Sequence, residues 1–472
     1  MSYAYINLDF SIMSIHTINP TNNMKVKSFE AMTEKTVDSK ISKSQLAFTH
    51  WKETSYQQRA DLLHKVAKIM RLKKSELAKT ITLEMGKLLA QAEGEIDLSA
   101  DILDYYADHG EEFLADKVLD PEYGEAIIRN SPIGVLLGVM PWNFPFYQVA
   151  RFAAPNIMVG NTILLKHASI VPQCAAAIEE LFEEVNAPEG LYTNLFISGK
   201  HASALVSDKR IKGVSLTGSE EAGASVAAEA GKHLKKVVLE LGGNDVFIIM
   251  EDADMEKTVE WAVVGRMNNN GQCCVASKRF IAVEAIADEF IQKFKDKLSK
   301  MKVGDPMDPE TELGPLSSEE AAMHLADQVK RSVDEGAKIL LGGKRADRKG
   351  AFMEPTILTD LKPGIAAYHE ELFGPVASLY VVKDEQAAID LANDSDFGLG
   401  ASVFTQDIER GKRIADQIDT GMVFINHPTW TQADLPFGGT KQSGFGRELS
   451  ELGIQEFVNK KLIRISALSD PF

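Results

Sequence analysis

The chain has 472 residues, which is too long for one ordinary hydrophobic core, so we expect two large lobes. Its hydrophobic fraction of 44% and charged fraction of 25% are typical of a soluble globular protein and exclude a disordered chain. The formal net charge of −17 argues against nucleic acid or an anionic membrane as partner, because both need a basic face.

The three cysteines, Cys174, Cys273 and Cys274, are too few and odd in number for a disulfide framework. A reducing compartment, the cytoplasm, is therefore predicted. The adjacent pair has no CxxC spacing, so no structural metal site is expected. No stretch reaches the roughly 20 apolar residues that span a bilayer, so no membrane partner is expected.

The N-terminal segment 1–20 contains Asp9 and lacks the basic start and long apolar core of a secretory signal. We interpret it as an extension or linker, with Met13 as an alternative start. From Tyr56 to about Leu114 the apolar residues recur at helical spacing.

The remainder alternates between strand-like and helix-like segments. Residues 133–140 form an almost continuous apolar run, as in a buried parallel strand. Further strands are predicted at 162–165, 213–216, 237–239, 246–250, 280–283, 339–341, 376–382 and 422–425. This alternation predicts an α/β protein with two lobes and a seam at Gly242-Gly243. The tail 457–465 is predicted to be a strand that pairs outside its own lobe.

Cys273 and Cys274 follow an amphipathic segment and an Asn-Gly-Gln turn. A cysteine presented on such a turn is a candidate nucleophile, although free cysteines are more often small core residues. Cys174 lies on a predicted helix and is expected in the core. Cys273 could act as a redox partner of Cys274, but a packing role is favoured because adjacent cysteines bridge only with strain.

Glu240 stands at the end of an apolar strand, just before Gly242-Gly243. Ligands of open α/β sheets bind at the carboxyl ends of strands, so a partly desolvated Glu240 could serve as a general base with a raised pKa. Its alternative role is a helix cap or an ion pair.

Two loops add further candidates. Asn143 lies between Pro141 and Pro145, directly after the 133–140 strand, where its amide could donate to an oxyanion or simply complete a rigid loop. Gly218-Ser219 follows a strand and opens a helix, an arrangement that binds phosphate through free N–H groups. It is not a GxGxxG motif, so this signal is weak alone.

Together these segments resemble the aldehyde dehydrogenase superfamily. The resemblance extends in family order from about Ile18 to the C-terminus and rests on seven motifs: Pro141-Trp142-Asn143-Phe144-Pro145, Leu164-Leu165-Lys166, Thr217-Gly218-Ser219, Leu239-Glu240-Leu241-Gly242-Gly243, Gly271-Gln272-Cys273-Cys274, Glu371-Leu372-Phe373-Gly374-Pro375, and Pro436-Phe437-Gly438-Gly439 with Gly444-Phe445-Gly446-Arg447-Glu448. The chain looks most like bacterial NADP-dependent succinate-semialdehyde dehydrogenases.

The resemblance implies roles for three catalytic residues. Cys274 would attack the aldehyde, and the Asn143 side chain with the Cys274 backbone N–H would hold the oxyanion. Hydride would leave to the nicotinamide, giving a thioester on Cys274. Glu240 would then activate the water that releases the acid.

The resemblance also implies the architecture. It predicts a Rossmann-like, doubly wound cofactor lobe, a doubly wound catalytic lobe and a small β oligomerisation element. The implied domains are 1–116 with 133–241 for the cofactor, 242–450 for catalysis, and 117–132 with 451–472 for oligomerisation. A homodimer or a pair of dimers is the expected assembly.

The cofactor is expected to be NADP, with NAD as the weaker alternative. The residues implied to bind it are Trp142, Asn143, Lys166, His167, Ala168, Ser169, Gly218, Ser219, Leu241, Glu371 and Phe373. Many relatives carry a glutamate where Ser169 stands, and that carboxylate favours the free ribose hydroxyl of NAD. A neutral Ser169 beside the cation of Lys166 leaves room for the 2′-phosphate of NADP.

The predicted substrate is the small aldehyde succinic semialdehyde. Arg151 stands where related semialdehyde enzymes carry an arginine, and on a substrate tunnel it could pair with a distal carboxylate. Its alternative is an interface or surface arginine. Asn268 replaces a second arginine of some relatives, while Thr431 and Gln432 stand where a serine often helps. His427 could also line the pocket.

Other functions stay open in the sequence. A broader aliphatic or glutarate-semialdehyde dehydrogenase would share the same catalytic residues. A CoA-acylating enzyme would transfer the same thioester, but such relatives generally lack the glutamate that Glu240 matches. A non-enzymatic protein on this fold would be expected to have lost Cys274 or Glu240.

Overall fold

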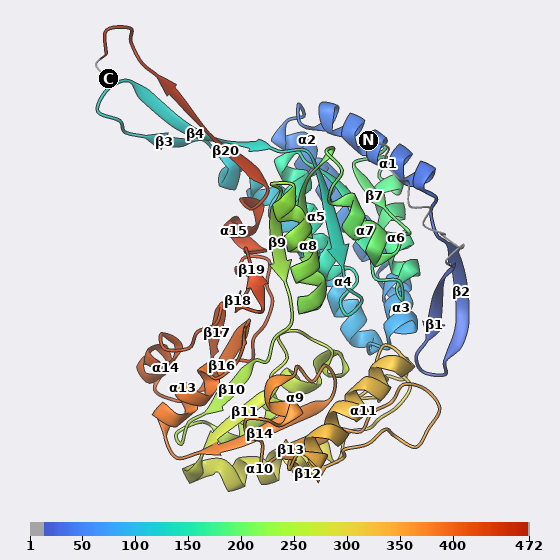
Figure 1. The fold of residues 1–472 in the computed structure, drawn as a ribbon, viewed down its shortest axis with the longest axis vertical. Helices are drawn as coiled ribbons and strands as arrows, with labels where there is room; N and C mark the ends of the chain where they lie inside the picture. The colour runs from blue at the N-terminus through green and yellow to red at the C-terminus, as the bar shows by residue number, and fades with distance from the viewer. Residues whose placement is uncertain (1–13, 471–472) are drawn as a thin grey trace, which may run out of the picture.

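The computed structural model describes residues 14–470 and contains two α/β lobes with a projecting β arm (Figure 1). The prediction of two α/β lobes is confirmed. None of the described helices combines the length and the apolarity needed to cross a membrane.

The first lobe is built on a six-stranded sheet that is parallel except for one edge. In spatial order its strands are β19 (Gly444–Phe445), β9 (Lys236–Glu240), β8 (Ile211–Thr217), β5 (Val135–Met140), β6 (Thr162–His167) and β7 (Tyr192–Asn194). β19 pairs antiparallel with β9. Gly444 and Phe445 therefore join this sheet although they follow the whole second lobe in the chain.

Helices cover both faces of the first sheet. They are α1 (Glu34–Trp51), α2 (Tyr56–Leu72), α3 (Lys74–Met85), α4 (Leu89–Leu114), α5 (Tyr147–Val159), α6 (Pro172–Glu184), α7 (Gly199–Leu205) and α8 (Glu220–Lys232). Successive strand residues point to opposite faces, so Leu136 packs with α2 to α6 while Leu137 packs with α1, α7 and α8. All residues of α5 are buried, which makes it the central helix of this lobe.

The second lobe contains a seven-stranded sheet. Its strands, in spatial order, are β12 (Lys338–Leu341), β13 (Thr356–Thr359), β14 (Val376–Val382), β11 (Arg279–Val283), β10 (Val246–Ile249), β16 (Gly400–Phe404) and β17 (Met422–Ile425). Only β12 runs antiparallel. Its helices are α9 (Met255–Met267), α10 (Glu284–Leu298), α11 (Glu319–Asp334), α12 (Ala366–His369), α13 (Glu385–Asn393) and α14 (Ile408–Ala415), and the short 3₁₀ helix η1 spans Asn268–Gly271. Short strands β15 (Phe397–Gly398) and β18 (Thr440–Lys441) pair beside it.

The arm consists of β3 (Lys117–Leu119), β4 (Glu125–Pro132) and β20 (Val458–Ile465). The short helix α15 (Ser450–Ile454) precedes β20 in the chain. β20 pairs along all eight residues with β4. The predicted tail strand thus pairs with a segment more than 300 positions earlier, and the arm extends away from both lobes (Figure 1).

The N-terminal segment requires a correction. Residues 14–19, interpreted as part of a linker, form strand β1 (Ser14–Asn19) of a hairpin with β2 (Met24–Glu30). Buried Thr17 donates to Glu84 on α3, while the Pro20 carbonyl accepts the Ala351 N–H of the second lobe at 2.8 Å. The hairpin therefore contacts both lobes. The alternative start at Met13 lies outside the described residues.

Candidate active site

The loop that carries Cys273 and Cys274 is held in a strained, left-handed backbone. Asn269 and Asn270 have φ of 54° and 56°, a conformation that asparagine tolerates better than most residues. The Asn269 amide donates to the carbonyls of Asn143 at 2.8 Å and Gln272 at 3.0 Å. The predicted turn after α9 thus fixes the cysteines against the 141–145 loop of the other lobe.

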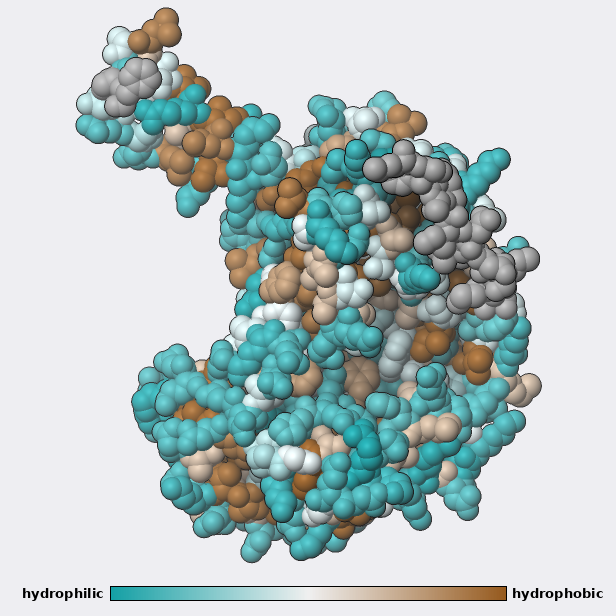
Figure 2. Space-filling model, in the orientation of Figure 1, coloured by the Kyte–Doolittle hydropathy of each residue, from teal (hydrophilic) through white to brown (hydrophobic). Residues whose placement is uncertain are grey.

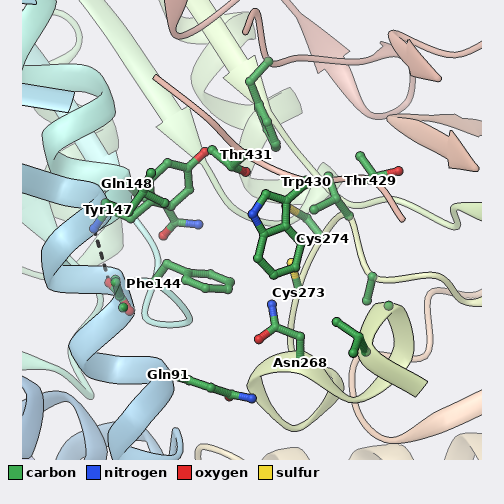
Figure 3. Close-up of a pocket in the computed structure, with 18 residues that line it drawn as sticks. Gln91, Phe144, Tyr147, Gln148, Asn268, Cys273, Cys274, Thr429, Trp430 and Thr431 are labelled. Atoms are coloured by element: carbon green, nitrogen blue, oxygen red, sulfur yellow. Dashed lines mark hydrogen bonds between the residues drawn. The ribbon is translucent and has the colours of Figure 1, made fainter. Parts of the chain in front are cut away.

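Both cysteines face a cavity of about 280 Å³, which we name the Trp430 cavity. Figure 3 shows Phe144, Gln148, Asn268 and Trp430 directed into it around the two sulfurs. Thr431 lines this cavity as well. Gln432 is exposed and lies outside the cavity lining, and so does His427, whose ring packs against Trp261.

A second cavity of about 230 Å³, the Trp142 cavity, has part of its lining in common with the first. It unites seven of the predicted cofactor residues: Trp142, Asn143, Gly218, Ser219, Leu241, Glu371 and Phe373. Cys274 and Gln148 line both cavities. Cys274 therefore stands between the two spaces, which is the position a residue needs to act on both a substrate and a cofactor.

Asn143 is buried and oriented by two hydrogen bonds. Its Nδ2 donates to the Gln272 carbonyl at 3.0 Å, and its Oδ1 accepts from Gln148 Nε2 at 3.1 Å. An amide nitrogen carries two hydrogens, so one remains for another acceptor. This arrangement suits donation to an oxygen bound at Cys274.

The thiols of Cys273 and Cys274 form a hydrogen bond with each other. Their mutual hydrogen bond, together with Lys278, outweighs burial and lowers the pKa of Cys273 to about 7. The same hydrogen bond and burial raise the pKa of Cys274. Because the groups interact, the first negative charge belongs to the pair, and it can form near neutral pH.

Glu240 ends β9 and is buried, with neither carboxylate oxygen hydrogen-bonded in the described part of the chain. Burial raises its pKa well above the usual carboxyl range, against the nearby charge of Arg151. A Cβ on Gly438 would stand 2.8 Å from its Oε1, so a glycine there makes room for the carboxylate. Glu240 lines neither cavity as it stands.

Arg151, predicted on the substrate tunnel, lies behind the cavity wall. It pairs with Glu448 and donates to Tyr147 Oη at 2.9 Å and Thr217 Oγ1 at 3.1 Å. Its guanidinium also covers the ring of Phe437 at 4.6 Å. Tyr147 and Phe437 line the Trp430 cavity, but Arg151 does not. Its contact with a substrate carboxylate stays a prediction, and the structure places one layer of side chains in between.

The end of β6 and the residues that follow it carry four of the predicted cofactor residues, Lys166, His167, Ala168 and Ser169. The Lys166 ammonium has no ion-pair partner in the described part of the chain, and burial lowers its pKa. His167 is different, since its Nε2 contacts the Pro145 carbonyl at 2.8 Å and its Nδ1 accepts the Ala168 N–H at 2.9 Å. Both ring nitrogens are therefore occupied within the chain. His167 braces the 141–145 loop and has no free nitrogen for a ligand.

The hydrogen-bonding and charged groups of the predicted cofactor residues suit a dinucleotide that carries an extra phosphate. Ser219 caps α8 and lines the Trp142 cavity, so the first turn of this helix, which attracts phosphate, borders the cavity. Glu371 is held by the Gly243 N–H at 3.2 Å and presents a carboxylate suited to sugar hydroxyls. The cation of Lys166, beside the neutral Ser169, suits an extra phosphate.

Several residues of the site carried no local sequence signal. Gln148, Tyr147 and Trp430 reach the cavities from α5 and from the loop after β17. Glu448 belongs to the last of the seven motifs, but nothing in that motif indicates that it pairs with Arg151. Lys278 was also missed, although it follows Cys274 by four positions. Only the packing of the two lobes brings these side chains together.

Comparison with known proteins agrees with this geometry. Residues 10–463 match the model of the aldehyde dehydrogenase family. The chain is 50% identical over 448 residues to a succinate-semialdehyde dehydrogenase (NADP(+)) of Deinococcus radiodurans, covering 95% of this chain and 94% of the relative. It is 46% identical over 454 residues to a probable enzyme of the same name from Synechocystis, covering 96% and 100%.

A solved structure is also similar. The succinic semialdehyde dehydrogenase of Streptococcus pyogenes, determined in complex with NADP+ as the cofactor, superposes with a TM-score of 0.94 at 45% identity. The match covers 96% of this chain and 100% of that one. The resemblance stated from the seven motifs is confirmed.

Proposed function

The chain belongs to the aldehyde dehydrogenase family, and from this premise we propose that it oxidises succinic semialdehyde to succinate with NADP. The observation that carries the proposal is the position of Cys274 in the lining of both the Trp430 cavity and the Trp142 cavity. An aldehyde bound in the first cavity and a cofactor bound in the second would meet at its sulfur.

The proposed mechanism begins at Cys274. Its thiolate attacks the aldehyde carbon, and the free hydrogen of Asn143 Nδ2 with the Cys274 N–H holds the resulting oxyanion, a donor being worth about 3 kcal/mol in comparable sites. NADP, held by the residues of the Trp142 cavity, would supply the acceptor for the hydride that leaves the carbon. Glu240 then takes a proton from the water that hydrolyses the thioester on Cys274. For that step its carboxylate must turn from Gly438 toward the cavities.

The substrate proposal rests on the named relatives and on the charge behind the cavity. The Trp430 cavity has aromatic and amide walls, and the Arg151 charge acts on it through Tyr147 and Phe437. Thr431, in the same wall, would donate to the substrate carboxylate. Relatives that bear the name succinate-semialdehyde dehydrogenase (NADP(+)) support both the aldehyde and the cofactor.

The proposal extends to assembly and location. We propose that residues 117–132 and 451–472 join copies of the chain into a dimer or a pair of dimers. The cofactor domain would comprise 1–116 and 133–241, and the catalytic domain 242–450. A cytoplasmic location is supported by the three cysteines, which are unpaired in the structure.

A substrate matrix tests the function. Succinic semialdehyde, glutaric semialdehyde and hexanal are each assayed with NADP and NAD by absorbance of the reduced cofactor. We expect the highest kcat/KM for succinic semialdehyde with NADP. Cys274→Ala should lower that value by at least about a thousandfold, as loss of a nucleophile does elsewhere. A folded Cys274→Ala protein with the parent rate would refute the mechanism, and a higher kcat/KM with NAD would refute the cofactor.

A further inference from the structure

Lys278 is a buried ammonium that the proposed mechanism does not use. It lies just before β11, and only 2% of its side chain is exposed. Burying a charge is costly unless it is paired and hydrogen-bonded. The contacts that stabilise this ammonium therefore indicate what it holds in place.

Those contacts connect the two halves of the site. Lys278 Nζ pairs with Glu371 Oε1 at 2.9 Å. It also donates to the backbone carbonyls of Cys274 at 2.6 Å and Cys273 at 3.0 Å. Glu371 lines the Trp142 cavity and Cys274 lines both cavities, so one ammonium joins a carboxylate that faces the cofactor space to the backbone of the thiol.

The same cluster fixes the turn between the lobes. Glu371 Oε1, which pairs with Lys278, also accepts the Gly243 N–H at 3.2 Å. A Cβ on Gly243 would stand 2.6 Å from the Cys274 carbonyl oxygen, so the turn packs directly on the nucleophile's backbone. Glu371, Lys278 and Cys274 thus lie around one glycine.

Electrostatics add to this geometry. The titratable groups that face Lys278 are Glu371, Asp245, Cys273 and Cys274. Burial raises the pKa of Asp245 to about 8, so that carboxyl is largely neutral at pH 7. Glu371 is then the ionised carboxylate that pairs with the ammonium. The charge of Lys278 also lowers the pKa of both thiols, which favours a thiolate at the cysteine pair.

We propose that Lys278 is a positioning residue that couples Glu371, in the cofactor space, to the nucleophile Cys274. The proposal rests on the proposed function, which assigns Glu371 to the cofactor and Cys274 to the aldehyde. One buried charge would keep Glu371 ionised and oriented for ribose hydroxyls and hold the Cys274 carbonyl. Cofactor affinity and thiol reactivity would therefore fall together when that charge is removed.

The test compares Lys278→Met, Lys278→Arg, Glu371→Gln and the double variant Lys278→Met/Glu371→Gln. Titration calorimetry with NADP gives the dissociation constant without turnover. We expect Lys278→Met and Glu371→Gln each to weaken NADP binding about tenfold, within the usual range of coupling between sites. The double variant should be no weaker than the worse single variant, because both changes break one interaction. Lys278→Arg should restore part of the affinity.

A second readout follows the thiol. The rate of alkylation of Cys274 by iodoacetamide is measured against pH without cofactor, with the modified residue assigned by mass spectrometry of peptides. Loss of the positive charge should move the alkylation midpoint to higher pH in Lys278→Met and leave it nearer the parent value in Lys278→Arg. A role confined to packing would not move this midpoint.

Arg279→Met is the matched control. Arg279 is the next residue and another buried cation, but its hydrogen bonds run to the carbonyls of Asn244, Leu391 and Ala392. Folded Arg279→Met should keep the NADP affinity and the alkylation midpoint of the parent, whatever its loss of thermal stability. If Lys278→Met does not fold, Glu371→Gln probes the same pair from its other end, and Lys278→Arg probes it with the positive charge kept.

The outcomes separate the two proposals. If the parent protein binds NADP and oxidises the aldehyde, yet Lys278→Met matches it in affinity and alkylation or loses no more than Arg279→Met, the coupling role is refuted. Additive losses in the double variant would refute it as well. If the parent protein neither binds NADP nor oxidises aldehydes, the proposed function fails instead.

Discussion

The guanidinium of Arg151 is held on three sides by the chain itself. Its N–H groups pair with Glu448 and donate to the hydroxyls of Tyr147 and Thr217. Burial alone would lower the pKa of Arg151, but the charge of Glu448 outweighs burial, so the pKa is raised. Arg151 therefore carries a permanent positive charge close behind the Trp430 cavity. In a poorly screened interior such a charge acts over several ångströms.

Replacing Arg151 tests how that charge is used. We expect Arg151→Met to raise KM for succinic semialdehyde at least about tenfold more than KM for hexanal, because only the former carries a carboxylate to attract. Steady-state kinetics with both aldehydes measures the difference. Arg151→Lys, which keeps the charge, serves as control. Equal losses for both aldehydes would mean that Arg151 only supports Glu448 and the fold.

Glu240 should set the pH dependence of turnover. A base works only after losing its proton, and burial raises the pKa of Glu240, so kcat should rise with pH through a midpoint above the ordinary carboxyl range. Arg151 lowers this pKa, so Arg151→Met should shift the midpoint to higher pH. The kcat profiles of the two proteins measure the shift, and an unchanged or lower midpoint would contradict it.

Glu240→Gln should separate the two halves of the reaction. Without a base the thioester should form and then persist, because the amide cannot accept a proton from water. Rapid mixing should give one equivalent of reduced cofactor per site, followed by a steady-state rate lowered at least about a hundredfold. Cys274→Ala, which removes the burst itself, is the control. A parent steady-state rate would remove Glu240 from the mechanism.

At the scale of elements, the end of β6 and the 141–145 loop depend on one buried histidine. Burial lowers the pKa of His167 to about 4, so the ring is neutral in the folded protein at pH 7. Unfolded, it titrates near its ordinary value of about 6.5. The stability linked to His167 is therefore complete above about pH 6.5 and is lost as the pH falls toward 4, by at most about 3 kcal/mol.

The matching experiment uses His167→Gln, whose amide can still donate to the Pro145 carbonyl. Urea unfolding at pH 7.5 and pH 5.0 gives the free energy of unfolding of each protein. The parent should lose more stability than His167→Gln between these two pH values, because only the parent gains a proton at this site on unfolding. Equal losses would show that the ring does not titrate as its burial requires.

The three-stranded β arm buries few of its own apolar side chains. Val118, Leu462 and Ile465 on it are 78%, 61% and 61% exposed. Figure 2 shows hydrophobic colour along the arm, which projects away from both lobes. A three-stranded sheet with open edges and exposed apolar side chains is stable when another chain covers it. The arm is therefore the place for the proposed self-association.

Charge placed on the arm should dissociate the assembly. We expect Val118→Lys/Leu462→Lys to shift the protein toward the monomer mass of 51.8 kDa, measured by sedimentation or by light scattering after gel filtration. Leu72→Lys is the matched control, since Leu72 is 76% exposed at the end of α2 on the body of the protein. The same mass for both variants and the parent would argue that the arm is not the interface.

Local order in the sequence determined most of the elements and the chemistry of the site. Apolar runs predicted the strands β5, β14 and β17, and helical spacing predicted α2 to α4, because both patterns lie in consecutive residues. Cys274, Asn143 and Glu240 each lie within a short motif, so neighbouring residues are enough to single them out. The hairpin of residues 14–30 was not predicted, because the residues that it contacts lie on both lobes and far away in the sequence.

Tertiary structure decided which side chains meet. That Arg151 pairs with Glu448, that His167 braces the Pro145 loop, and that Lys278 joins Glu371 to Cys274 follows only when two sheets and their loops pack together. These contacts join residues up to about 300 positions apart, as in Arg151 with Glu448. A local pattern carries no information on such pairs, because their energies depend on burial and distance, which the packing of the lobes creates.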